Sequence, residues 1–166
     1  MHAFAKWLEA TALSQGIQDR IWLIELLQTI HILSVAMVFS AVVMVGLRIT
    51  GARHTYDQTL PETVRRFMPW FWTAVAVLAA TGTVLIIGEP RRALDDNLPF
   101  LAKMIMVALA VAAALAFEMS LQRRPAFWDD GSRRQALRRC LAVAGIVLVC
   151  AIIVAGRWIA YSGPDD

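Results

Sequence analysis

The sequence predicts an all-α protein: an integral membrane four-helix bundle with an N-terminal interfacial amphipathic helix. The composition is 58% hydrophobic and 17% charged, and the mean hydropathy is +0.58, which is more apolar than in ordinary soluble domains. The apolar residues come in long blocks, and a helix needs about 20 such residues to cross a bilayer. We therefore expect a single membrane domain over residues 1–166.

The interfacial helix is expected at residues 2–13. Phe4 and Trp7 recur at helical spacing, while Lys6 lies on another face. An amphipathic helix of this kind lies in the plane of the membrane surface. The polar residues 14–16 are predicted to end it.

Four membrane spans are predicted, at about 21–47, 70–87, 100–121 and 140–161. Before the second span, Thr59-Leu60-Pro61-Glu62 matches a capping box with a proline in the first turn, so this helix should begin near Leu60, outside the membrane. Alanines recur every four residues on the third span, and such ridges allow close helix packing. They are compatible with a homodimer.

The basic residues predict the orientation in the membrane. Most of them lie in the loops after the first and third spans, whereas the second loop and the C-terminal tail hold few or none. Because positively charged loops stay in the cytoplasm, both termini should lie on the periplasmic side of a bacterial inner (cytoplasmic) membrane. The arginines flank apolar blocks rather than forming a binding face, so the expected partner is membrane lipid and not nucleic acid.

One histidine in the first span is the leading functional candidate. An ionisable group at this depth is costly in hydrocarbon, so His31 should face the bundle interior and have a partner or a ligand. Gln28 lies one turn away from it. Toward the periplasmic side, Lys103 opens the third span, and Arg157 and Tyr161 close the fourth.

These residue types suggest a haem b site. The His31 imidazole would ligate the iron, and Lys103 and Arg157 would meet the propionates near the aqueous boundary, with Gln28 and Tyr161 beside them. The protein would then act in redox chemistry, with a quinone or a redox partner protein as its electron partner. The other histidines, in a loop and at the N-terminus, do not supply a sixth ligand.

A structural interpretation stays open beside this one. The cations would then snorkel to the boundary or pair with carboxylates, and His31 would only hydrogen-bond to Gln28 or Ser34. The chain would be a cofactor-free accessory subunit or a small transporter-like bundle. Since no HExxH, CxxC, Walker A or GxSxG pattern is present, no residue is assigned a catalytic role.

Several segments carry a family resemblance. WLEATALSQGI, ELLQTIHILSVAMV, GLRITG, FLAKM and GRWIAY together resemble a family of uncharacterised small bacterial four-helix membrane proteins. More distantly, the chain is similar to HemJ-type protoporphyrinogen oxidases and to the membrane domain of CopD-type copper resistance proteins. The HemJ resemblance implies that His31 is a haem-ligand histidine and Lys103 a functional lysine. The intramembrane Arg157 departs from that pattern, so the oxidase activity does not transfer directly.

Overall fold

The computed structural model describes residues 2–51, 59–90, 98–123, 128 and 132–161. Within these residues the regular elements are helices: α1 (His2–Glu9), α2 (Ala12–Gln18), α3 (Ile21–Thr50), α4 (Leu60–Gly88), α6 (Leu98–Arg123) and α8 (Ser132–Tyr161). The last four are long and apolar enough to cross a membrane. The predicted all-α four-helix membrane bundle is therefore confirmed. The spans expected from the sequence all lie inside these four helices.

Local signals set the ends of the helices. Gly51 ends α3 with a positive φ of 73°, and its N–H donates to the carbonyl of Arg48 at 3.3 Å. A left-handed residue at this position favours glycine because it carries no Cβ. At the start of α4, the backbone N–H of Thr59 donates to the Glu62 carboxylate at 2.8 Å, which confirms the predicted capping box.

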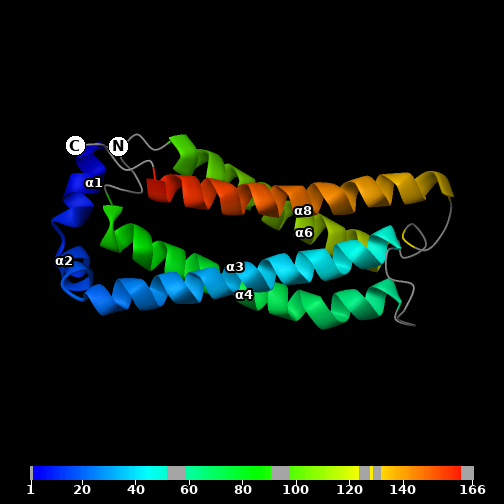
Figure 1. The fold of residues 1–166 in the computed structure, drawn as a ribbon, viewed down its shortest axis with the longest axis horizontal. Helices are drawn as coiled ribbons and strands as arrows, with labels where there is room; N and C mark the ends of the chain where they lie inside the picture. The colour runs from blue at the N-terminus through cyan, green and yellow to red at the C-terminus, as the bar shows by residue number, and fades with distance from the viewer. Residues whose placement is uncertain (1, 52–58, 91–97, 124–127, 129–131, 162–166) are drawn as a thin grey trace.

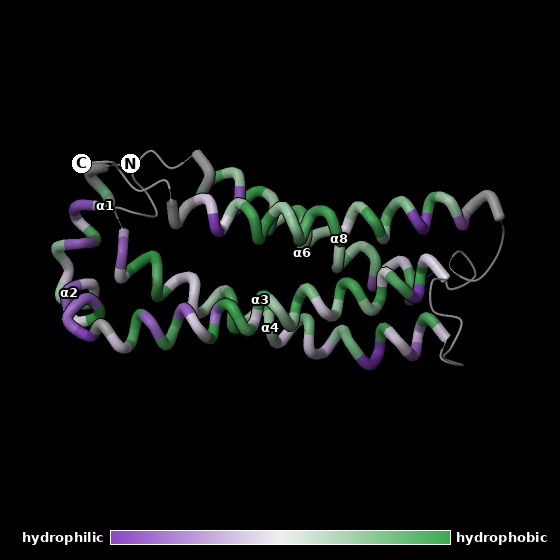
Figure 2. The backbone as a smooth tube through the Cα atoms, viewed as in Figure 1, coloured by the Kyte–Doolittle hydropathy of each residue, from purple (hydrophilic) through white to green (hydrophobic). Residues whose placement is uncertain are grey.

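The four long helices run along the long axis of the molecule (Figure 1). α3 packs against α4 and α8, and α6 packs against α8. Figure 2 shows hydrophobic residues along these helices, whereas polar residues gather in α1, α2 and near the helix ends. Large apolar side chains such as Ile32 and Leu33 are 64% exposed, as expected for a surface whose solvent is lipid.

The two ends of the bundle differ in composition. We call the end with α1, α2 and the last turn of α8 the terminal end, and the opposite end, where α3 finishes and α4 begins, the arginine end (Figure 1). Most of the buried core lies toward the arginine end, where Val45 of α3, Val64 of α4 and Leu121 of α6 share one cluster with Trp128. The helices are thus held together chiefly at that end.

The N-terminal segment corrects the sequence-based expectation. Instead of one helix at 2–13, two helices form, and the break falls at Ala10–Thr11 rather than at residues 14–16. The Thr11 hydroxyl caps α2 by accepting from the Ser14 N–H at 3.3 Å. The position of this segment at a membrane surface stays a prediction.

Ser14 shows what α2 does. Its side chain is fully buried, and its hydroxyl donates to the carbonyl of Ile87 at 2.7 Å. A Cβ built on Gly88 would lie 2.9 Å from a methyl carbon of Ile17, so the glycine lets α2 sit directly on the last turn of α4. α2 therefore covers α4 at the terminal end.

Gly46 offers a test of the α3–α8 contact. A Cβ at position 46 would already lie 3.0 Å from Cδ1 of Ile146, whereas one at Gly145 meets no heavy atom within 4 Å. Gly46→Leu should force α3 and α8 apart and lower the free energy of unfolding by about 1–3 kcal/mol. Thermal unfolding in detergent measures this, with Gly145→Leu as the matched control. Equal losses in both variants would show that α3 and α8 do not depend on this close approach.

Candidate functional site

The candidate site is built around a hydrogen bond between α3 and α4. Nδ1 of His31 lies 2.8 Å from Oγ1 of Thr81. The two helices run in opposite directions, with His31 ten residues after the start of α3 and Thr81 seven residues before the end of α4. They therefore meet at similar depth in the terminal half of the bundle. Thr81 is buried and His31 half-buried.

The partners of Thr81 favour one tautomer of His31. A threonine hydroxyl has a single proton to donate, and Oγ1 of Thr81 donates it to the carbonyl of Val77 at 2.8 Å. With the proton on this carbonyl, the same oxygen accepts from Nδ1–H of His31. In the neutral ring the other nitrogen, Nε2, then carries the lone pair. The arrangement presents an oriented imidazole with a ligating nitrogen.

Gly82 borders the same ring. A Cβ at this position would have Cε1 of His31 as its nearest neighbour, at 3.5 Å. Cε1 lies between the two ring nitrogens, so the edge of the imidazole faces an α4 position that carries no side chain. The backbone of α4 thus borders the ring without a bulky group on that edge.

Lys103 reaches from α6 toward α8. Its side chain is half-buried, and a Cβ on Gly156 would lie 3.4 Å from its Nζ. Lys103 lies five residues after the start of α6, which begins at the terminal end, so it lies in the same half of the bundle as His31 (Figure 1). The structure therefore brings His31 and Lys103 into one region and places Lys103 beside the residue that precedes Arg157.

The remaining residues predicted for the site are less closely joined. Arg157 is exposed on α8, and Gln28 is exposed on α3, one turn from His31. Tyr161 is the last residue of α8, and its side chain lies outside the described part of the chain. Ser34 is buried, but its hydroxyl donates to the carbonyl of Ile30 at 2.8 Å.

The histidine partner was not the one expected. The sequence suggested Gln28 or Ser34, one turn away on the same helix, whereas the hydrogen bond goes to Thr81 on the neighbouring helix. Counting residues inward from the ends of two antiparallel spans puts Thr81 level with His31. This count is the sequence signal that could have identified Thr81 as the partner.

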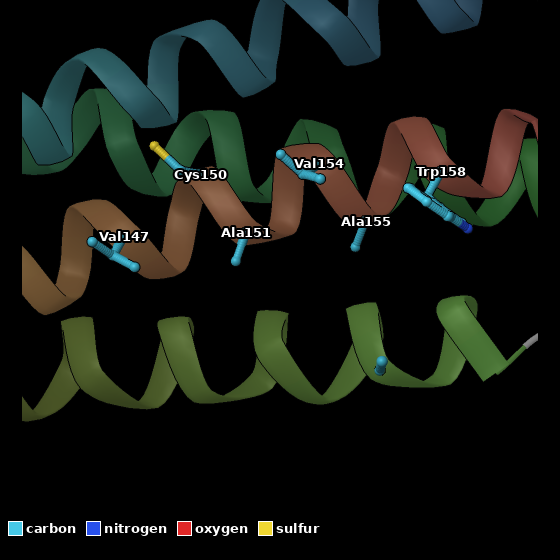
Figure 3. Close-up of a pocket in the computed structure, with 7 residues that line it drawn as sticks. Val147, Cys150, Ala151, Val154, Ala155 and Trp158 are labelled. Atoms are coloured by element: carbon cyan, nitrogen blue, oxygen red, sulfur yellow. The ribbon is translucent and has the colours of Figure 1, made fainter.

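An apolar groove runs between α6 and α8, with a volume of about 540 Å³. Figure 3 shows Ala151 and Ala155 pointing from α8 toward α6, and these small side chains leave the space open. Ala102, which precedes Lys103, and Trp158 also line it. The groove is lined by apolar residues and by Cys150, and Lys103 is not part of its lining.

The donor set is small. Among the described residues there is no group of three or more His, Cys, Asp or Glu side chains placed to hold a metal ion. A ligand held at His31 would therefore have one imidazole to bind, with a lysine ammonium in the same region.

Comparison with known proteins identifies one family. Residues 61–158, which are 98 of the 166 residues, match the model for copper resistance protein D. The matched part contains Thr81, Lys103 and Arg157 but not His31. No curated protein and no solved structure matches the chain.

Thr81→Val tests the α3–α4 hydrogen bond, because valine keeps the side-chain shape and removes the hydroxyl. The partly buried imidazole N–H then loses its acceptor, so the free energy of unfolding should fall by about 1–3 kcal/mol. Thr83→Val is the matched control: its hydroxyl makes the same 2.8 Å bond to the preceding turn, at Ala79, but the residue is exposed. Thermal unfolding gives the stability, and ¹⁵N NMR of the histidine gives its tautomer. A Thr83→Val loss as large as that of Thr81→Val would mean that the bond to His31 contributes nothing.

Proposed function

The chain belongs to the copper resistance protein D family of membrane proteins, and we propose that it binds haem b with His31 as the axial ligand and acts in membrane redox chemistry. The observation that carries the proposal is the 2.8 Å hydrogen bond between Nδ1 of His31 and Oγ1 of Thr81, with the imidazole as the donor in the proposed tautomer. It leaves Nε2 as an oriented donor in the interior of a membrane protein.

A single histidine suits a haem better than it suits a bare metal ion. The porphyrin supplies four nitrogens to its iron, so one protein ligand is enough. A free transition-metal ion needs several donors from the protein itself. The described residues place one imidazole here without a cluster of further His, Cys, Asp or Glu side chains. The donor set therefore fits a haem.

Thr81 has a positioning role in this proposal. Metal-ligating histidines almost always donate their other N–H to an oxygen, which fixes the tautomer and raises the basicity of the ligating nitrogen. Thr81 meets that requirement from α4, and its own hydroxyl proton is held by Val77. The imidazole is thus oriented before any ligand arrives.

The cations would hold the carboxylates of the porphyrin. Hydrogen bonds from lysine and arginine to a carboxylate are stronger than bonds between neutral groups. Lys103 lies in the same half of the bundle as His31, and its ammonium group lies beside Gly156. Gly156 is the residue directly before Arg157. Lys103 and Arg157 are therefore proposed to meet the propionates, with Gln28 and Tyr161 at the edge of the site.

The haem would supply one-electron chemistry, and the protein would bind it, orient it and keep it in an apolar environment. A quinone in the membrane or a redox partner protein would exchange the electrons. We propose the bacterial inner membrane as the location, with both termini on the periplasmic side, since the basic loops favour that orientation.

Copper handling is the second candidate, and the family match is the observation that favours it. Imidazole is a good ligand for copper, so Nε2 of His31 would again be the donor. Such a site requires further donors beyond the imidazole, and it predicts a bound metal without a haem spectrum.

His31→Ala tests the main proposal. Protein purified in detergent from haem-replete bacteria should show a Soret band that is lost in His31→Ala and kept in His54→Ala, which removes a histidine outside the predicted spans instead. Thr81→Val should weaken haem binding by about 10–100-fold, the range found when a residue supporting a metal ligand is replaced. Copper content is measured on the same samples. A colourless wild-type protein contradicts the haem proposal; copper that depends on His31 would then favour the second candidate, and no metal the cofactor-free alternative.

Lys103→Met tests the proposed propionate contact. A hydrogen bond to a charged group contributes about 1.5–3 kcal/mol, so haem retention should fall about tenfold or more. Lys6→Met removes an exposed lysine from α1 and serves as the control. Arg157→Ala examines the second cation in the same assay. If haem retention is unchanged in Lys103→Met and Arg157→Ala, both cations have structural roles.

A further inference from the structure

Gly82 of α4 lies against the edge of the His31 ring, and helix packing does not explain its presence. A Cβ built on Gly46 or Gly88 would lie 3.0 Å or 2.9 Å from a side chain of a neighbouring helix. On Gly82 the nearest described atom of another helix would be Cε1 of His31, at 3.5 Å, and no second one lies within 4 Å. This is an ordinary van der Waals distance, so an alanine would fit at position 82 without moving a helix.

The backbone of α4 does not require a glycine at this position either. Among the described glycines, a positive φ is found at Gly51 and not at Gly82. In the interior of a helix, glycine is destabilising relative to alanine because it loses more conformational freedom on folding. One place where glycine is nevertheless favoured is where the backbone must lie close to a ligand.

The geometry around the ring shows what the missing side chain leaves open. Cε1 is bonded to both nitrogens of the His31 ring, and it is the single ring atom within 4 Å of a Cβ at position 82. Nδ1 is engaged by Thr81 at 2.8 Å, so the nitrogen beside this edge that is left for a ligand is Nε2. His31 and Gly82 are both half-buried, so this edge keeps some exposed surface.

The width of a ligand decides whether a side chain at position 82 would obstruct it. A single metal ion on Nε2 lies beyond that nitrogen, which is itself farther than 4 Å from the Cβ position. A macrocycle surrounds its metal with four nitrogens, so it extends sideways beyond the imidazole and across the Cε1 edge. A side chain at position 82 would therefore compete for space with a flat macrocycle but not with a bare ion.

A second glycine repeats the pattern at Lys103. A Cβ on Gly156 would meet two described atoms within 4 Å, Nζ and Cε of Lys103, at 3.4 Å and 3.6 Å. The imidazole and the ammonium group that the proposed function uses are thus each bordered by a glycine, on two different helices.

From these observations we infer that Gly82 is a specificity-determining residue, which keeps the Cε1 edge of His31 open so that Nε2 can bind a flat metal macrocycle as well as a bare metal ion. The inference rests on the proposed function and deepens it. Gly82 makes no bond to the ligand in this role; it acts by leaving space beside the imidazole.

The test uses the full-length protein in detergent, freed of metal and titrated with haemin or, separately, with copper(II). Gly82→Ala adds one methyl group beside the ring. Gly145→Ala is the matched control, since a Cβ there meets no heavy atom within 4 Å. The Soret absorbance gives the haemin affinity, equilibrium dialysis gives the copper affinity, and thermal unfolding without ligand gives the stability.

We expect Gly82→Ala to weaken haemin binding by about tenfold or more, the scale of an extra methyl group in a filled space, and to leave the copper affinity unchanged. Without ligand it should unfold at the wild-type temperature or higher, because alanine is the better helix former. Gly145→Ala should keep the haemin affinity. The inference is overturned if Gly82→Ala binds haemin as tightly as the wild type, loses copper affinity equally, or unfolds at a clearly lower temperature without ligand.

A chemical probe separates a failure of this inference from a failure of the haem proposal. Diethyl pyrocarbonate modifies the unprotonated nitrogen of an imidazole, and mass spectrometry measures the modification of His31 without any haem. Gly82→Leu should slow this modification several-fold, and Gly145→Leu should not. If the wild type binds no haemin but this difference is found, the haem proposal fails and the open edge of His31 stands. An unchanged rate in Gly82→Leu overturns the inference whatever the haemin result.

Discussion

The hydrogen bond between His31 and Thr81 connects α3 and α4, which share the most extensive contact among the described helices, and it constrains what the histidine can do. In a hydrocarbon environment a polar group must find its partner inside the protein. Thr81 meets this requirement for one ring nitrogen and, by doing so, leaves the other available. The same contact therefore serves the stability of the α3–α4 pair and the chemistry of the imidazole. A structural role and a ligating role for His31 are consistent with each other. The two interpretations differ only in whether Nε2 binds a ligand.

The sequence was sufficient for the architecture because the signals involved are local. The length of each apolar block and the Thr59–Glu62 capping box depend only on neighbouring residues, and both agree with the structure. The partner of His31 was missed because Thr81 lies 50 residues away in the chain. The break between α1 and α2 was misplaced for a similar reason. Residues 14–16 look like a helix end in isolation, but Ser14 is helical and bonds to Ile87, which is 73 residues distant.

The family match and the candidate ligand come from different parts of the chain. The copper resistance protein D region begins at residue 61, after α3 has ended, so it includes the residue that orients the imidazole but not the imidazole itself. Thr81, Lys103 and Arg157 lie inside the matched region, and α3 brings the histidine to it. The proposed ligand site thus depends on how α3 docks against that region. The close approach of Gly46 to Ile146 fixes this docking at the opposite end.

The position of α2 on the last turn of α4 has a consequence for the order in which the protein is made. Ser14 bonds to Ile87, and Ile17 packs against Gly88. Ile87 and Gly88 leave the ribosome long after α2 does. At about 5–20 residues per second, the 73 residues between Ser14 and Ile87 take roughly 4–15 s to synthesise. During that interval α2 lacks the last turn of α4, and two long apolar helices, α3 and α4, must be made before it can dock there. α2 is therefore made well before the part of α4 that holds it in place.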